Sequence, residues 1–271
     1  EELEYVILPK VRIGCVDFLN TGAAVADLKR SSVIACLNVD GIIGANLMRK
    51  AIWQIDYENQ VIRISNSIDS LDIENGERIA FDQKITGTPI VDININGTIV
   101  KNVTIDTGSN GGFSLAEKTY REAKDSLAPV AIGIGTTTSG LYGLGEVDTN
   151  YYTTFPSVSI GEIKLTNQLV DFNKGKSLTL GNSFFENYDV TYNWFEKEMI
   201  LTNKKENDNS SFESFGFSYF LTDNKLLVSL LIEGSDAENN GIKRGDQIIA
   251  INGVDYSEMT LEKWCDILHT S

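Results

Sequence analysis

The chain has 271 residues, 42% of them hydrophobic, which is enough to bury the cores of two domains, or of two domains and a small module. Its 23 Lys and Arg against 38 Asp and Glu give a formal net charge of −15, which repels phosphate backbones and anionic membranes and argues against nucleic acid as a partner. No apolar run reaches the ~18 residues of a membrane span, and the acidic first residues do not resemble a signal peptide.

Most of the chain is expected to form β-strands, because β-branched and aromatic residues alternate with polar ones between glycine and polar breaks. In chain order, the strand-like segments are residues 5–14, 52–65, 88–106, 151–165 and 189–203. Helical periodicity is found mainly at residues 114–126 and 260–271. The predicted fold class is therefore mostly β.

Two parts of the chain resemble each other, which predicts two related lobes. Residues 5–14 match residues 152–161, and Ile42-Ile43-Gly44 matches Thr179-Leu180-Gly181 in the same order along the chain. The second copy is preceded by residues 80–151, whereas the first copy begins almost at the shared part. We therefore assign residues 1–75 to the C-terminal part of a first, incomplete lobe and residues 76–203 to a second lobe.

The polar residues 204–214 are expected to be a linker, with a separate module at residues 215–271. Residues 212–271 resemble a PDZ domain on a set of spaced motif residues, namely Ser235, Ala237, Gly241, Ile242, Gly245, Asp246, Ile248, Ile251, Asn252 and Gly253. A PDZ domain normally adds one more strand after its last helix, so we expect a truncated α+β module.

The PDZ resemblance implies a peptide-binding site. A bound peptide would add a strand to the module by β-augmentation. Its C-terminal carboxylate would accept hydrogen bonds from backbone N–H groups of the loop formed by Phe215, Gly216, Phe217 and Ser218. An alternative role for the module is docking onto the lobes to regulate them.

Histidine and cysteine limit the chemistry. The single histidine, His269, excludes a histidine-based triad and a multi-histidine metal site, so carboxylates are the expected acid–base groups and no metal or other cofactor is expected. Cys15, Cys36 and Cys265 have no metal-ligand spacing, and an odd number cannot all pair within the chain. We expect them to be small buried apolar residues.

The stretch from Val103 to Leu115 combines one carboxylate, Asp106, with small turn-forming residues. Its first residues are expected to end a strand, residues 108–112 to reverse the chain, and Phe113 to begin the next apolar element. Amide hydrolysis without a metal needs a base that activates water and an acid that protonates the leaving amine. Two facing aspartates that share one proton supply both, and they titrate as a pair.

On the motif Asp106-Thr107-Gly108-Ser109 and the signatures at residues 42–44 and 179–181, residues 1–203 resemble aspartic proteases of the pepsin and retropepsin type. In particular, the chain resembles bacterial two-lobed retropepsin-like proteins that carry a C-terminal PDZ domain. The resemblance implies acid-protease-like β-barrel lobes, with both apolar-apolar-Gly signatures packed beneath active-site loops. It also implies catalytic roles for Asp106, Thr107 and Gly108.

The same resemblance places a flap over the bound peptide at the Gly-rich residues 132–147. It implies substrate contacts for Ser109, Gly140, Tyr142 and Gly143, although Tyr142 is equally well explained as a surface-loop aromatic.

The chain holds only one Asp-Thr-Gly, whereas the family needs two aspartates. By the repeat, the second aspartate is expected upstream of Tyr5, outside residues 1–271. Three explanations stay open: the missing N-terminal part of the first lobe supplies it, a second copy of the chain supplies it, or the protein is inactive and binds peptides.

The leading interpretation is an aspartic endopeptidase acting on a peptide or protein substrate. The single aspartate leaves open whether this chain is active alone. The alternative is a catalytically inactive peptide-binding protein that uses the protease-like cleft and the PDZ module. Peptidases with PDZ modules often work outside the cytoplasm, which favours a periplasmic or secreted location.

Overall fold

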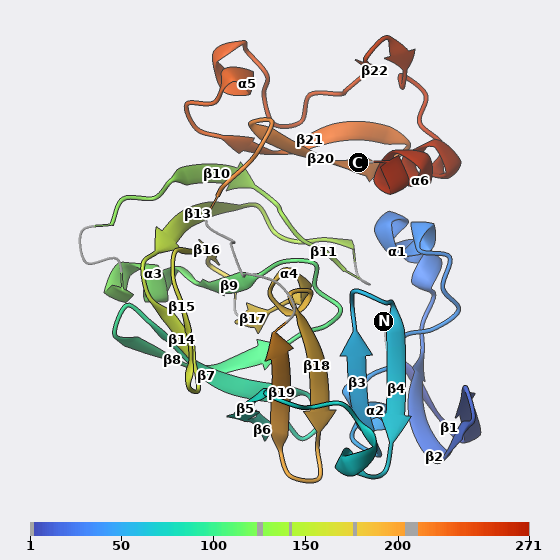
Figure 1. Ribbon diagram of the computed structural model, residues 1–271. Coiled ribbons are helices and arrows are strands. Elements are labelled where there is room, and N and C mark those ends of the chain that lie inside the picture. The colour runs from blue at the N-terminus through green and yellow to red at the C-terminus, as the bar shows by residue number, and fades with distance from the viewer. Residues whose placement is uncertain (1–2, 124–126, 141–142, 176–177, 204–210, 271) are drawn as a thin grey trace. The chain divides into compact units, whose positions relative to one another are not determined.

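A computed structural model of the chain describes residues 3–123, 127–140, 143–175, 178–203 and 211–270 (Figure 1). The chain forms two compact units that are not contiguous in sequence. The first unit contains residues 1–25, 43–128 and 153–211, and the second contains residues 26–42, 129–152 and 212–271. The predicted division into domains by sequence position remains a prediction.

The first unit contains a five-stranded sheet in which the two repeats meet. Its strand order is β4 (Val61–Ser65), β3 (Ile52–Asp56), β18 (Tyr188–Asn193), β19 (Glu198–Asn203) and β5 (Glu77–Ala80). The hairpins β3–β4 and β18–β19 come from matching places in the two repeats, and β3 and β18 are antiparallel neighbours (Figure 1). Every residue of β18 is buried, so this strand forms the centre of the sheet.

A second set of strands in the first unit carries the Asp-Thr-Gly segment. They run in the order β15 (Ile163–Leu165), β14 (Val158–Ile160), β7 (Pro89–Ile95), β8 (Thr98–Ile105), β17 (Thr179–Leu180), β9 (Phe113–Ala116) and β16 (Gln168–Asn173), and β6 (Asp82–Gln83) pairs with β7. Side chains along β7 alternate between buried and more exposed, as a half-buried strand requires. The chain is mostly β, as its composition predicts.

The other elements of the first unit are short. The hairpin β1 (Glu4–Ile13) and β2 (Val16–Val25) forms a two-stranded sheet. The helices are α2 (Ala45–Met48), η2 (Ile68–Ser70), α3 (Glu117–Ala123) and α4 (Asn182–Phe185). The helix predicted at residues 114–126 is partly wrong, because its first residues belong to β9, where the apolar alternation is used in parallel pairing with β16.

The second unit is built on the hairpin β20 (Phe217–Thr222) and β21 (Lys225–Ile232), which extends through β10 (Ala131–Gly135) to β13 (Asp148–Phe155), of which residues 148–152 belong to this unit. Thus residues from the Gly-rich segment 132–147 pair with the C-terminal module, Gly133 opposite Ile232 and Gly135 opposite Leu230. Gly135 has φ +146, and a Cβ there would lie 2.1 Å from the carbonyl oxygen of Ser229. Only glycine allows the two strands to approach so closely.

Smaller elements complete the second unit. They are η1 (Leu28–Arg30), α1 (Ser32–Cys36), β11 (Ser139–Gly140), β12 (Gly143–Leu144), α5 (Asp236–Asn239), β22 (Ala250–Ile251), β23 (Val254–Asp255) and α6 (Leu261–Thr270). Helix α6 confirms the helix expected near the C-terminus. Its Trp264 is buried with Met259, Leu226 and Cys36 in one apolar cluster, so α1 helps to form the core of this unit.

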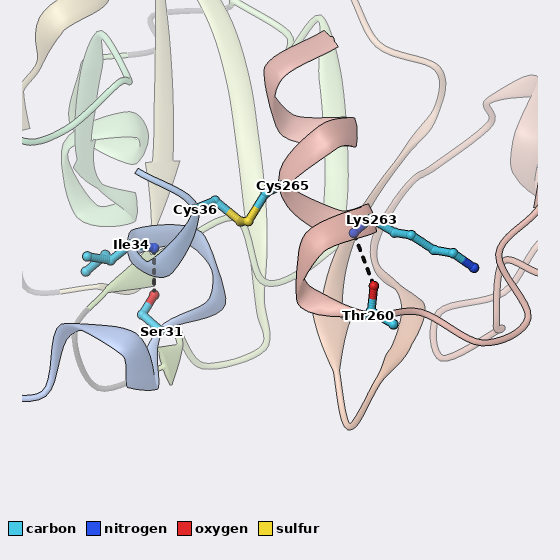
Figure 2. The surroundings of a disulfide bond; sticks show 6 residues. All are labelled: Ser31, Ile34, Cys36, Thr260, Lys263 and Cys265. Atoms are coloured by element: carbon cyan, nitrogen blue, oxygen red, sulfur yellow. Dashed lines mark hydrogen bonds between the residues drawn. A yellow bond between two sulfur atoms is a disulfide. The ribbon is translucent and has the colours of Figure 1, made fainter. Parts of the chain in front are cut away.

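Cys36 of α1 and Cys265 of α6 form a disulfide (Figure 2). Both helices begin with a hydroxyl cap: Ser31 Oγ accepts the N–H of Ile34, and Thr260 Oγ1 accepts the N–H of Lys263 (Figure 2). The expectation that the cysteines are simple buried apolar residues is wrong, because two are bonded and Cys15 is exposed. A pairing across 229 residues leaves no local spacing for a sequence pattern to detect.

A buried carboxyl in the first unit makes stability depend on pH. The residue Asp171 is only partly covered, but its carboxyl is enclosed: burial raises its pKa to about 6, opposed by the 2.7 Å hydrogen bond from Ser114 Oγ. Because the pKa of this carboxyl is higher in the folded than in the unfolded protein, its contribution to stability is fully present at pH values below the unfolded-state pKa. That contribution is lost as the pH rises through the folded-state pKa of about 6. We expect Asp171→Asn to be more stable than the parent at pH 7.

The measurement is the free energy of unfolding in denaturant at a series of pH values. The advantage of Asp171→Asn should disappear as the pH falls from about 6 to the ordinary carboxyl pKa of about 4, because the parent carboxyl then becomes neutral as well. An advantage that stays constant over this range would show that the charge on Asp171 is not its cause.

Candidate active site

Asp106 follows the last residue of β8, as the sequence predicts, and is partly buried. Its backbone N–H donates to the carbonyl of Leu180 (2.9 Å), and its carbonyl accepts the N–H of Ser109 (3.1 Å). Its Oδ1 accepts the N–H of Gly108 (2.9 Å). These bonds close a tight turn and aim one carboxylate oxygen at the turn's own backbone. Thr107 and Ser109 lie in the same turn and are partly exposed.

Leu180 and Gly181 support this turn. Leu180 lies between β8 and β9, opposite Ile105 and Phe113, and is completely buried. Gly181 crosses the loop so closely that a Cβ there would lie 2.4 Å from the carbonyl oxygen of Gly111. The second apolar-apolar-Gly signature therefore packs beneath the Asp-Thr-Gly loop, and the methyl-bearing Thr179 fits the strand.

The first signature is placed differently. Ile42 is 68% exposed and Ile43 is 48% exposed, whereas Leu180 at the matching position is 0% exposed. Leu180 is flanked by two strands, but among the described residues no strand pairs with residues 42–43. The expectation that both signatures pack beneath loops is met only in the second copy.

The carboxylate alone cannot supply both an acid and a base at one time. In the described part of the chain, no second carboxylate is hydrogen-bonded to Asp106, and no group of three or more His, Cys, Asp or Glu could hold a metal ion. The loop thus presents one carboxylate on a rigid strand end, which is half of the arrangement expected for an aspartate pair. Sequence reasoning missed Asn182, which donates to the carbonyls of Thr107 and Ser109 in this loop, and Tyr57, whose hydroxyl donates to the Asn182 side chain.

The predicted flap residues belong to the second unit. Gly140 and Gly143 pair with each other in the β11–β12 hairpin. Tyr142 lies outside the described residues. The assignment of these residues to substrate contacts remains a prediction.

The predicted peptide-binding loop of the module precedes and begins β20. Phe215 is exposed, and Phe217 and Ser218 pair with Leu231 and Leu230 of β21. Gly216 has φ +87, and its N–H donates to Ser214 Oγ (3.0 Å). A bound carboxylate would have to displace the Ser214 hydroxyl to reach this N–H group.

The chain was compared with known proteins. The PDZ domain family matches residues 202–271, so the PDZ resemblance is confirmed. Among solved structures, the chain is similar to a retropepsin-like aspartic protease from Rickettsia conorii, with 20% identity and a TM-score of 0.34 over 47% of this chain and 89% of that one. These values are too low to assign an activity. No curated protein matches the chain. No helix among the described residues is long and apolar enough to cross a membrane.

Proposed function

We propose that residues 1–271 are part of an aspartic endopeptidase in which Asp106 is one member of the water-activating pair. The observation that carries the proposal is the Asp106 turn itself: a carboxylate at a strand end, bonded by the Gly108 N–H and supported by the buried Leu180. In the proposed mechanism, one aspartate of the pair accepts a proton from water while the other protonates the developing oxyanion or the leaving amine. Thr107 steadies the facing loops.

The burial of matching residues supports a second aspartate that comes from outside these residues. Phe155, Val158 and Ile160 in the second repeat are completely buried, and β14 pairs with β7. At the matching places of the first repeat, Leu8 is 37% exposed and Val11 and Ile13 are only partly buried, and the neighbouring Tyr5 and Ile7 are 77% and 74% exposed. A β segment related to residues 80–151, carrying its own Asp-Thr-Gly or Asp-Ser-Gly, would cover these apolar side chains and bring the partner carboxylate.

The disulfide bears on location. Disulfides persist mainly in oxidising compartments, so the Cys36–Cys265 bond supports a periplasmic or secreted protein. The substrate is proposed to be a peptide or protein.

A second candidate function is peptide binding without catalysis. It is favoured by one observation, the confirmed PDZ match at residues 202–271 beside a single Asp-Thr-Gly. Here the module would add a peptide strand to β20, whose partner on one side is β21.

The test is cleavage of unstructured peptides by the protein with its complementary first-lobe segment present, from acidic to neutral pH. Catalysis predicts cleavage at acidic pH, where one member of the pair is protonated, and inhibition by a statine-type transition-state mimic. Binding of peptides with no cleavage at any pH would establish the second candidate and overturn the first.

A further inference from the structure

Asn182 connects the Asp106 turn to a distant part of the first unit. Its backbone N–H donates to the carbonyl of Ser109 (2.8 Å), and its side-chain Nδ2 donates to the carbonyl of Thr107 (2.7 Å). Its Oδ1 accepts the hydroxyl of Tyr57 (2.8 Å), which follows β3 and lies 125 residues away in sequence. The carboxamide is therefore bonded on both sides, once to the loop and once to the turn after β3.

The Thr107 carbonyl belongs to the same peptide unit as the Gly108 N–H. A trans peptide is planar, so its C=O and N–H point in opposite directions, and fixing the oxygen also fixes where the hydrogen points. That hydrogen points at Asp106 Oδ1. A hydrogen bond to the carbonyl also polarises the peptide and strengthens the bond that its N–H donates.

The two partners of the carboxamide together set which way it faces: the Thr107 carbonyl can only accept and so requires Nδ2, and the Tyr57 hydroxyl donates to Oδ1 on the other side. Burial, with a smaller contribution from the charge of Glu186, raises the pKa of Tyr57 to about 12, so its hydroxyl keeps its proton at physiological pH and donates to Oδ1. With Oδ1 facing Tyr57, Nδ2 faces the Thr107 carbonyl. The reverse orientation would place the amide oxygen against that carbonyl and leave the peptide without a donor.

We propose that Asn182 and Tyr57 are positioning residues that aim the Gly108 N–H at Asp106 through the Thr107–Gly108 peptide. Their role in catalysis rests on the proposed function, because it matters only if Asp106 reacts. The hydrogen-bonded chain of Tyr57, Asn182, the peptide and Asp106 can be tested in residues 1–271 without any catalytic assay.

Two substitutions that change no charge test separate links of this series of hydrogen bonds. Tyr57→Phe removes only the hydroxyl, and Asn182→Ala removes the carboxamide. Asn187→Ala is the matched control, because Asn187 also donates its side-chain amide to backbone carbonyls, those of Ser183 and Phe184, but not to the loop. NMR hydrogen exchange is measured at the Gly108 amide and at the amides of β18.

We expect the Gly108 amide to exchange about tenfold faster in Tyr57→Phe and Asn182→Ala, since a tenfold change corresponds to about 1.4 kcal/mol, which is within the range of the net contribution of one ordinary hydrogen bond. In both variants the amides of β18 should exchange at the rate found in the parent, and in Asn187→Ala the Gly108 amide should do so as well. Equal Gly108 exchange in the parent and in Tyr57→Phe, which is the variant least able to disturb folding, would overturn the proposal.

A kinetic measurement on the assembled protease separates this inference from the proposed function. Both variants should lower kcat about tenfold with KM within about twofold of the parent, as expected for a group that acts on the reacting carboxylate rather than on substrate binding. If Asp106→Asn abolishes cleavage but neither variant lowers kcat, positioning is wrong and the proposed function stands. If Asp106→Asn leaves cleavage unchanged, the proposed function fails, and the Gly108 exchange still decides the hydrogen-bonded chain.

Discussion

Asp106→Asn is expected to lower the rate of peptide cleavage by about four orders of magnitude, the size of loss seen when one member of a catalytic set is removed. Asparagine has nearly the same shape, and its Oδ1 can still accept the Gly108 N–H, so the turn should keep its geometry. What is lost is the ability to carry and exchange a proton with the partner carboxylate. Initial rates on an unstructured peptide at acidic pH give the measurement.

Asp40→Asn is the matched control for this variant. Asp40 is the aspartate that precedes the first apolar-apolar-Gly signature, at residues 42–44, and it lacks a Thr-Gly neighbour. We expect the Asp40→Asn variant to cleave peptides at the same rate as the parent. Cleavage that survives Asp106→Asn in a folded protein would contradict the mechanism. A similar loss of activity in Asp40→Asn would indicate that Asp40, within this chain, is the partner aspartate.

Removal of the disulfide should have the largest effect on the stability of the second unit. Cys265→Ser breaks a crosslink between residues 229 apart in sequence and loosens α1 from the cluster that contains Trp264. Loss of a native disulfide typically costs about 2–5 kcal/mol, and a long loop between the cysteines favours the upper part of that range. The measurement is denaturant unfolding under non-reducing conditions, followed by calorimetry of the same samples.

Cys15→Ser provides the matched control for this substitution. Cys15 is an exposed free thiol, so its replacement should change the free energy of unfolding by no more than about 0.5 kcal/mol. A dithiol reductant should lower the stability of the parent and leave Cys265→Ser unchanged. If Cys265→Ser is as stable as Cys15→Ser without reductant, the disulfide does not stabilise the folded protein.

The sequence predicts the Asp106 segment well because the signals are local. A run of β-branched residues up to Ile105 is followed by glycines and then by Phe113, and the structure has β8, a tight turn and β9 at these places. The repeat is similarly visible, because each copy carries its own strand pair, and those pairs meet as β3 and β18 in one sheet.

Long-range contacts could not be predicted in the same way. Nothing near Tyr57 in sequence indicates that its hydroxyl meets Asn182, and nothing near Cys36 indicates that α1 packs on α6. These contacts depend on how sheets and loops assemble in three dimensions, whereas periodicity and turn chemistry describe only neighbouring residues. The pairing of β10 with β21 is of the same kind, and Gly133 and Gly135 are its local traces in the sequence.

The most direct test of the central claim, that Asp106 is half of a pair completed from outside residues 1–271, is a rate comparison. Peptide cleavage is measured for residues 1–271 as an isolated monomer and again after the complementary segment with its own Asp-Thr-Gly or Asp-Ser-Gly is joined to it. We predict no cleavage by the monomer and rapid cleavage by the completed protein. Equal rates from the two samples would contradict the claim.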